Sequence, residues 1–143
     1  MACDLCSTDG GMLVLRNDNL RVALVDDVDH PGFCRVIWNA HVREMTDLQP
    51  PQIARLMDAV FAVEHAVRTV LAPHKINLAS LGNLTPHLHW HVIPRYETDA
   101  HFPRPVWAER LREEEAAARA ARRVRLDALA AEIRARLPAA PAA

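Results

Sequence analysis

Several features are missing from this sequence of 143 residues, and each absence excludes a class of protein. No run of about 18 apolar residues is present, so the sequence predicts no transmembrane helix. Between Met1 and Gly11 there are acids and cysteines where a secretory signal peptide carries a basic start and an apolar stretch. We therefore expect a soluble, cytoplasmic protein with no membrane partner.

An excess of positive charge is also missing. The 17 basic residues are sixteen Arg and a single Lys, and against 18 acidic residues they leave a net charge of −1. A protein that binds nucleic acid through a global basic field needs a clear positive excess. We therefore expect no specific nucleic-acid partner.

Cysteine is scarce. The chain has three, Cys3, Cys6 and Cys34, and an odd number at this length does not match a disulfide scaffold. Half of the residues are hydrophobic and 24% are charged, a composition that allows a buried core. The length predicts one domain. Cys34 falls within a predicted strand and is interpreted as a small buried apolar residue.

The order of apolar runs and turn residues predicts a mixed fold. Strands are expected over residues 12–16, 20–26, 33–38, 76–81 and 87–93, and the short turns between the first three favour antiparallel pairing. A helix is expected to begin at Pro50-Pro51, where proline costs no hydrogen bond, and to stop at Pro73. The sequence thus predicts an α+β fold with a five-stranded antiparallel sheet and one main helix.

The composition changes near residue 108, where Arg, Glu and Ala become dominant. We expect one long surface helix, or two, up to residue 137, with an apolar stripe made of Leu126, Leu129, Ile133 and Leu137. The interleaved acids favour a solvated face over a nucleic-acid or partner surface. We divide the chain into a catalytic part (1–106), a C-terminal helical extension (107–137) and a disordered tail (138–143).

The most informative segment places three histidines, His87, His89 and His91, at alternate positions. On a strand all three point to one face, while Leu88 and Val92 point to the other. Three readings are open: surface histidines, a metal site built from all three rings, and nucleophilic catalysis at phosphorus. In the last, a neutral imidazole attacks while its neighbours hold the anion. His30, His65, His74 and His101 are isolated in sequence and are expected to be exposed.

The run from His87 to Ile93 resembles the signature of the histidine-triad proteins, in which three histidines alternate with apolar residues. The Pro94-Arg95 that follows is similar to the branch that contains dinucleoside polyphosphate hydrolases. The resemblance covers about residues 3–96. It implies that His89 is the nucleophile, that His91 binds the α-phosphate and that His87 supports the site from one side.

The same resemblance implies further substrate contacts. Asp26 is similar to the residue that binds the ribose hydroxyls, and Asn83 to a polar amide near the phosphate. Many members have Ser or Thr three residues before the first triad histidine, but Leu84 stands there and Thr85 follows it. Either Thr85 makes this phosphate contact or one phosphate donor is missing.

Cys3 and Cys6 form a Cys-x-x-Cys pair, which alone fits zinc or a redox pair. Some histidine-triad proteins complete a zinc site with a histidine after the third strand and the first triad histidine. The resemblance therefore implies the ligands Cys3, Cys6, His41 and His87, a closed structural Cys2His2 set.

The function implied by the resemblance is a nucleotide hydrolase or nucleotidyl transferase that cleaves at the α-phosphate. Dinucleoside polyphosphates and nucleoside phosphoramidates are the expected substrate classes, and magnesium is expected to accompany a polyphosphate. A homodimer is expected as well. The alternative is a nucleotide-binding or scaffold protein with little catalysis.

Overall fold

The computed structural model describes residues 3–137, so the tail predicted at residues 138–143 lies outside the described residues. In chain order the elements are α1 (Asp4–Ser7), β1 (Met12–Arg16), β2 (Leu20–Leu24), β3 (Cys34–Trp38), the 3-10 turn η1 (Met45–Asp47), α2 (Pro50–Leu71), β4 (Lys75–Ala79), β5 (His89–Arg95), α3 (Ala116–Arg123) and α4 (Leu126–Arg136). Among the helices of residues 3–137, none combines the length and apolarity that a membrane crossing requires.

The five strands form one sheet in the order β1-β2-β3-β5-β4, and every neighbouring pair is antiparallel. The predicted α+β fold is therefore confirmed. Strand β5 lies between β3 and β4, and its pairing with β3 sets Ile37 opposite His89 and Arg35 opposite His91. This register decides which side chains of β3 share a face with the histidines.

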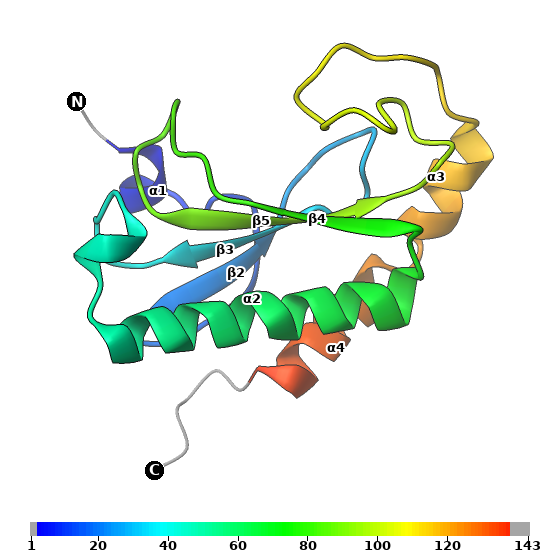
Figure 1. Cartoon of the computed structure of the whole chain (residues 1–143). Coiled ribbons are helices and arrows are strands. Elements are labelled where there is room, and N and C mark those ends of the chain that lie inside the picture. The colour runs from blue at the N-terminus through cyan, green and yellow to red at the C-terminus, as the bar shows by residue number, and fades with distance from the viewer. Residues whose placement is uncertain (1–2, 138–143) are drawn as a thin grey trace.

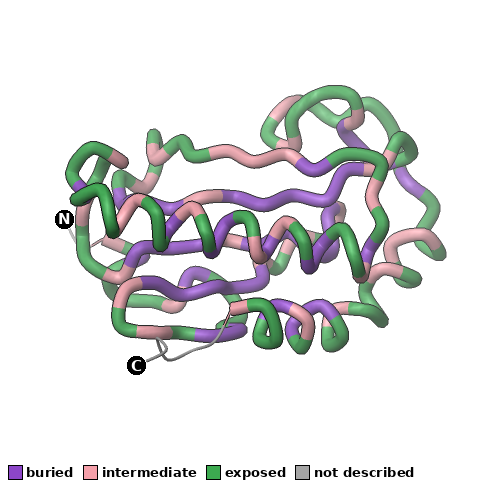
Figure 2. The backbone as a smooth tube through the Cα atoms, turned by 60° about the horizontal axis from the view of Figure 1, so that its bottom comes forward, coloured by how far each residue is buried: buried purple, intermediate pink, exposed green. Residues whose placement is uncertain are grey.

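Helix α2 covers one face of the sheet, as Figure 1 shows. Pro50 and Pro51 occupy its first turn, and it ends at Ala72, whose φ of 46° is left-handed, just before Pro73. The side of α2 that faces the sheet is buried, through Leu56, Ala59, Val60, Val63, Ala66, Val67 and Leu71. Figure 2 shows this alternation of buried and exposed turns along the helix.

Alternation along β5 separates the core from the histidines as predicted. Leu88, Trp90 and Val92 pack with the core under α2, and His89 and His91 lie on the opposite face. The bounds differ from the prediction, because β5 begins at His89 and continues through Pro94 to Arg95. The pairing with β3 ends at Val92, so Pro94 has β4 as its one neighbouring strand, the setting in which proline is tolerated.

The C-terminal segment consists of two helices, and residues 108–115 ahead of them are irregular. Leu129 and Ile133 of α4 are fully buried in the same core as α2 and β1, and Leu126 and Leu137 pack at its border. The Nε–H of Arg134 donates to the carbonyl oxygen of Val14, 2.9 Å away. The division at residue 107 stays a prediction, and α4 shares the core of the preceding residues.

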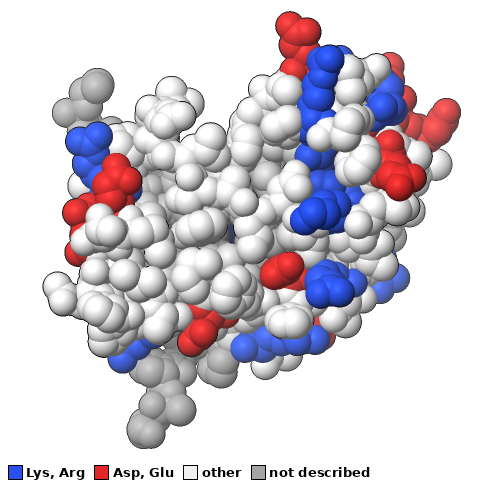
Figure 3. Space-filling view, viewed as in Figure 1, with Lys and Arg blue, Asp and Glu red and all other residues white. Residues whose placement is uncertain are grey.

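Charge is unevenly spread over the face shown in Figure 3. A broad uncharged area crosses the middle of this face, where β4 forms the edge of the sheet. Lys and Arg side chains gather together with Asp and Glu at the end that carries α3. The arginine-rich segment thus presents a surface of mixed sign on this face.

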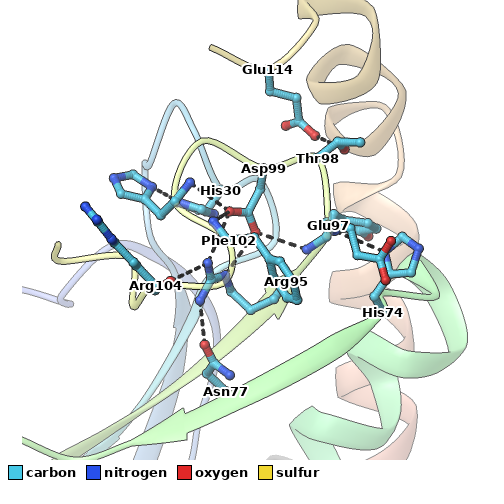
Figure 4. A network of polar contacts seen from close by, with 12 residues as sticks. His30, His74, Asn77, Arg95, Glu97, Thr98, Asp99, Phe102, Arg104 and Glu114 are labelled. Atoms are coloured by element: carbon cyan, nitrogen blue, oxygen red, sulfur yellow. Dashed lines mark hydrogen bonds and ion pairs between the residues drawn. The ribbon is translucent and has the colours of Figure 1, made fainter. Parts of the chain in front are cut away.

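A buried ion pair fixes the segment that follows β5 (Figure 4). Arg95 and Asp99 are 2% and 0% exposed, and the Nε–H of Arg95 donates to Asp99 Oδ2 at 2.9 Å. Three backbone N–H groups also donate to this carboxylate. Burial raises the pKa of Asp99, but the hydrogen bonds from Arg95 and the backbone outweigh it and lower the pKa to about 2. Asp99 thus anchors the irregular chain above the sheet.

The expectation that His30 and His101 are exposed is wrong. Both are buried, and Nε2 of His30 lies 2.9 Å from Nδ1 of His101. They are 71 residues apart in sequence, so only the folding of the β2–β3 loop against the segment after β5 brings them together.

The packing of α4 makes a testable prediction. Leu129→Ala removes a fully buried side chain, so we expect the free energy of unfolding to fall by about 2–5 kcal/mol in urea. Val124→Ala is the control, because Val124 is 81% exposed, and a change of about 0.5 kcal/mol or less is expected. Equal unfolding midpoints for the two variants would show that α4 does not share the core.

Candidate active site

His87 lies just before β5, and its ring contacts the end of β3 and the two N-terminal cysteines. Its Nε2–H donates to the carbonyl oxygen of Trp38 at 2.6 Å. This bond makes Nε2 the protonated nitrogen and leaves the lone pair on Nδ1. His87 is fully buried, and burial lowers the pKa of its imidazole. Its Nδ1 is therefore a neutral acceptor or metal ligand.

Four donor atoms converge on that side of His87. Its Nδ1 lies 3.4 Å from Sγ of Cys3, 3.5 Å from Sγ of Cys6 and 3.2 Å from Nδ1 of His41. All four atoms lie within 4.8 Å of one another. Around a tetrahedral ion with metal–nitrogen and metal–sulfur distances of about 2.0 and 2.3 Å, neighbouring ligand atoms are about 3.3–3.8 Å apart. The described residues thus form a candidate Cys2His2 metal site, and the reading in which His87, His89 and His91 share one ion is wrong.

Arg21 fastens the segment that carries the two cysteines. Its buried guanidinium on β2 donates to the carbonyl oxygens of Leu5, Thr8 and Asp9 and to the side chain of Asn39. Sequence reasoning missed this role, because an arginine in a five-residue strand gives no sign of which distant carbonyls it meets.

His89 is held in one tautomer by the main chain. Its Nδ1–H donates to the carbonyl oxygen of His87, 2.5 Å away, so the lone pair is on Nε2. Burial lowers the pKa of the His89 imidazole, and Arg35 lowers it further, while the hydrogen bond to the carbonyl opposes them. His89 is therefore a neutral imidazole near pH 7, which is the nucleophilic form.

His91 stands next to His89, with ring centroids 4.8 Å apart and the planes nearly perpendicular. Burial, followed by the neighbouring His89 and Arg35, lowers the pKa of His91 to about 3. Its Nδ1 is buried and has no hydrogen-bond partner among the described residues. A buried imidazole in that state binds a ligand through neutral hydrogen bonding and carries no charge of its own.

A cavity of about 230 Å³ opens over His89 and His91. Asn83, Leu84 and Thr85 line it, so the structure brings the predicted phosphate-side residues together with the triad. A second hollow of about 320 Å³ also reaches His89 and extends toward η1, with Arg43, Glu44, Met45 and Thr46 in its wall. His89 therefore borders open space on two sides.

Asp26 lies apart from these residues. It is exposed, two positions beyond the end of β2, and does not line the cavity over the triad. Its predicted contact with a ribose is therefore untested by the geometry.

Two aromatic residues beside His91 were not predicted as site residues. The ring of Trp107, which is 52% exposed, lies 5.0 Å from the His91 ring and lines the cavity. Phe33 packs edge-on against His91 at 5.3 Å. Trp107 follows the segment that Asp99 anchors, and its contact with His91 joins residues of different segments, which no local sequence pattern indicates.

Comparison with known proteins agrees with this geometry. A family model described as the HIT domain matches residues 11–98, which is more than half of the chain. The chain belongs to the HIT domain family. A curated relative, the "AP-4-A phosphorylase" of Mycobacterium tuberculosis (strain ATCC 25618 / H37Rv), is 30% identical over 102 residues. These residues are 67% of this chain and 52% of the relative, so the chain spans about half the length of that protein.

Solved HIT structures share the fold. A histidine triad protein from Bradyrhizobium japonicum is 26% identical, with a TM-score of 0.71 over 90% of this chain and 91% of its own. A Zn-bound histidine triad family protein from Mycobacterium smegmatis is 21% identical, with a TM-score of 0.59 over 92% of this chain and 97% of its own. The predicted recognition as a histidine-triad protein is thus confirmed.

The burial of His91 in this HIT domain makes a pH prediction. The pKa of His91 is lower in the folded protein than in the unfolded chain, so between about pH 6.5 and pH 3 the unfolded chain binds more protons than the folded protein. Lowering the pH through this range therefore lowers the stability of the fold. We expect His91→Gln to flatten the fall in unfolding free energy between these values, by at most about 1.4 kcal/mol per pH unit.

The measurement is a series of urea titrations across that range. The exposed His65→Gln variant on α2 is the control and is expected to keep the wild-type slope. A His91→Gln profile that runs parallel to the wild type would contradict the burial of a neutral His91.

Proposed function

We propose that this protein is a nucleotide hydrolase or nucleotidyl transferase that acts at the α-phosphate of a dinucleoside polyphosphate or a nucleoside phosphoramidate. Membership of the HIT family supports nucleotide chemistry in general. The name of the M. tuberculosis relative agrees with a dinucleoside polyphosphate as substrate. The observation that carries the proposal is the bond from Nδ1–H of His89 to the His87 carbonyl, which leaves a free lone pair on Nε2.

In the first step, Nε2 of His89 attacks the α-phosphorus and forms a nitrogen–phosphorus bond. The bond from phosphorus to the leaving group breaks, and the leaving group departs with its electron pair. The imidazole becomes positively charged, and the His87 carbonyl stabilises it by accepting the Nδ1–H bond. His91 and Thr85, which line the same cavity, are proposed to donate hydrogen bonds to the phosphate oxygens.

In the second step, water attacks phosphorus from the open side of the cavity. The nitrogen–phosphorus bond breaks and its electron pair returns to Nε2, which leaves His89 neutral. The attacking water loses one proton to solvent, and a nucleoside monophosphate is formed. The two hollows that meet at His89 leave room for a nucleoside on one side and a leaving group on the other. Asn83 is proposed to contact the phosphate or leaving group, and Asp26 the ribose.

His89→Asn tests the proposed nucleophile. We expect turnover of diadenosine tetraphosphate and of adenosine phosphoramidate to fall at least about 1,000-fold, because the covalent route is lost. Binding of AMP is expected to survive. Rapid acid-free quenching with radiolabelled substrate should trap a nucleotidyl adduct on the wild type and none on the variant.

The control is His65→Asn, which replaces an exposed histidine on α2 and is expected to keep wild-type turnover. If His89→Asn keeps most of the wild-type rate, the proposed mechanism is wrong. If the wild type binds AMP but forms no adduct and no product, the chain is a nucleotide-binding protein instead.

We also propose that the candidate Cys2His2 site binds zinc. The spacing of the four donor atoms and the fixed Nε2–H of His87 support it, because a hydrogen bond from the other ring nitrogen orients a ligating histidine. Cys3, Cys6, His41 and His87 would hold the ion with no open position, so it would supply structure and no chemistry to the reaction. Through these ligands the first helix would be tied to β5.

Metal analysis of the purified protein tests this site. We expect about one zinc per chain in the wild type, and Cys6→Ser to lower this to less than about half. Cys34→Ala is the matched control, because Cys34 is buried away from the site and burial raises the pKa of its thiol to about 12. Less than a tenth of an equivalent after expression with added zinc would overturn the proposal.

A homodimer is proposed to form at the edge strand β4. The uncharged area that crosses this edge supports it, because an unpaired edge strand favours pairing with another chain. Magnesium that accompanies a polyphosphate and a cytoplasmic location stay predictions.

A further inference from the structure

Arg35 is the charged residue of the site that the proposed mechanism leaves without a role. It lies on β3 directly opposite His91 in the sheet, and it lines the same cavity as His89 and His91. Its neighbours Cys34 and Val36 point into the core, so the alternation of β3 turns Arg35 toward the histidine face.

The guanidinium of Arg35 has one hydrogen bond to the main chain and one buried nitrogen without a partner among the described residues. Its Nη1–H donates to the carbonyl oxygen of Gly10 at 2.8 Å. Gly10 has a φ of 79°, and a Cβ there would lie 2.6 Å from Cδ1 of Ile37, so both the left-handed backbone and the close approach to β3 favour glycine. The Nε of Arg35 is buried and has no partner among the described residues, and the same holds for Nδ1 of His91 on the facing strand.

No carboxylate among the described residues pairs with the guanidinium of Arg35. The residues that line the cavity include no Asp or Glu, and none of the ion pairs within residues 3–137 involves Arg35. Arg21 on the same face of the sheet is different, because four acceptors satisfy its guanidinium. A half-buried, uncompensated guanidinium beside two neutral imidazoles is a site for an anion.

We propose that Arg35 binds the phosphate group that His89 attacks, and supplies the positive charge that the triad itself lacks. The proposal rests on the proposed function and names the residue that recognises its anionic substrate. The chain has Leu84 where related proteins are expected to present a hydroxyl, and this side chain is 96% exposed with no polar group. Arg35 on β3 thus adds a charge to the hydrogen bonds proposed for His91 and Thr85 in the same cavity.

Calorimetric titration with AMP and with adenosine tests Arg35, because the two ligands differ only by the phosphate. Arg35→Gln should weaken AMP binding at least about tenfold and leave adenosine binding within about twofold, as loss of a charged hydrogen bond predicts. Arg35→Lys should give an intermediate AMP affinity, because it keeps the charge and loses the Nε–H. Arg55→Gln, an exposed position on α2, is the matched control and should bind AMP like the wild type.

A purely structural role for Arg35 makes different predictions. If the contact with Gly10 is all that matters, Arg35→Gln should lower AMP and adenosine affinity together, and this outcome would overturn the proposal. Unchanged AMP affinity would overturn it as well. If Arg35→Gln does not fold, Arg35→Lys is used instead. A ratio of AMP to adenosine affinity in Arg35→Lys equal to that of the wild type would overturn the proposal.

Turnover of diadenosine tetraphosphate by the same proteins separates this inference from the proposed function. A wild type that binds AMP through Arg35 without turnover would end the hydrolase proposal and keep the assignment of Arg35. If the wild type and Arg35→Gln turn over substrate with equal KM and kcat and bind AMP with equal affinity, the hydrolase proposal stands and the assignment of Arg35 falls. A wild type with neither AMP binding nor turnover would overturn both.

Discussion

The hydrogen bond between Nδ1–H of His89 and the carbonyl of His87 is the contact on which the candidate site depends. His87 contributes to the candidate site in two separate ways. Its ring faces the two cysteines and His41, and its main chain sets the tautomer of the neighbouring histidine. Any change that moves the His87 backbone therefore alters the proposed nucleophile directly. The carbonyl of Thr85, which accepts the His87 N–H, and the carbonyl of Trp38, which accepts its ring N–H, hold this residue in place.

The electrostatics of the site follow from burial. His87, His89 and His91 are all buried, so their rings lose most contact with water. Desolvation keeps buried imidazoles neutral, which suits a nucleophile and leaves the site without charge from histidine. A guanidinium stays charged at any physiological pH, so Arg35 is the side chain in this cavity that attracts a phosphate over a wide pH range.

The features that were predicted correctly from the sequence depend on short-range patterns. Alternation from His87 to Val92 indicated both the core face and the histidine face, and prolines marked both ends of α2. The boundary of the C-terminal helices was not predictable in this way, because Arg, Glu and Ala are as frequent in the irregular stretch at 108–115 as in the helices.

Residues missed by sequence reasoning share a dependence on distant partners. Arg35 has apolar neighbours, and only the pairing of β3 with β5 sets it beside His91. The ring of Trp107 packs against His91 of another segment, and His30 meets His101 across 71 residues. Contacts of this kind between distant residues can be recognised only in the tertiary structure. The Cys2His2 set was predicted from the sequence because the resemblance to histidine-triad proteins indicated His41 and His87 as ligands.

The position of α4 has a consequence for how the protein is made. Its buried leucine and isoleucine complete a core that begins at β1, and Arg134 bonds to Val14 across 120 residues. A ribosome releases the chain from its N-terminus, so β1 and α2 emerge with apolar surface that has no cover until α4 has been synthesised. The growing chain is therefore expected to need chaperone protection until α4 has emerged from the ribosome.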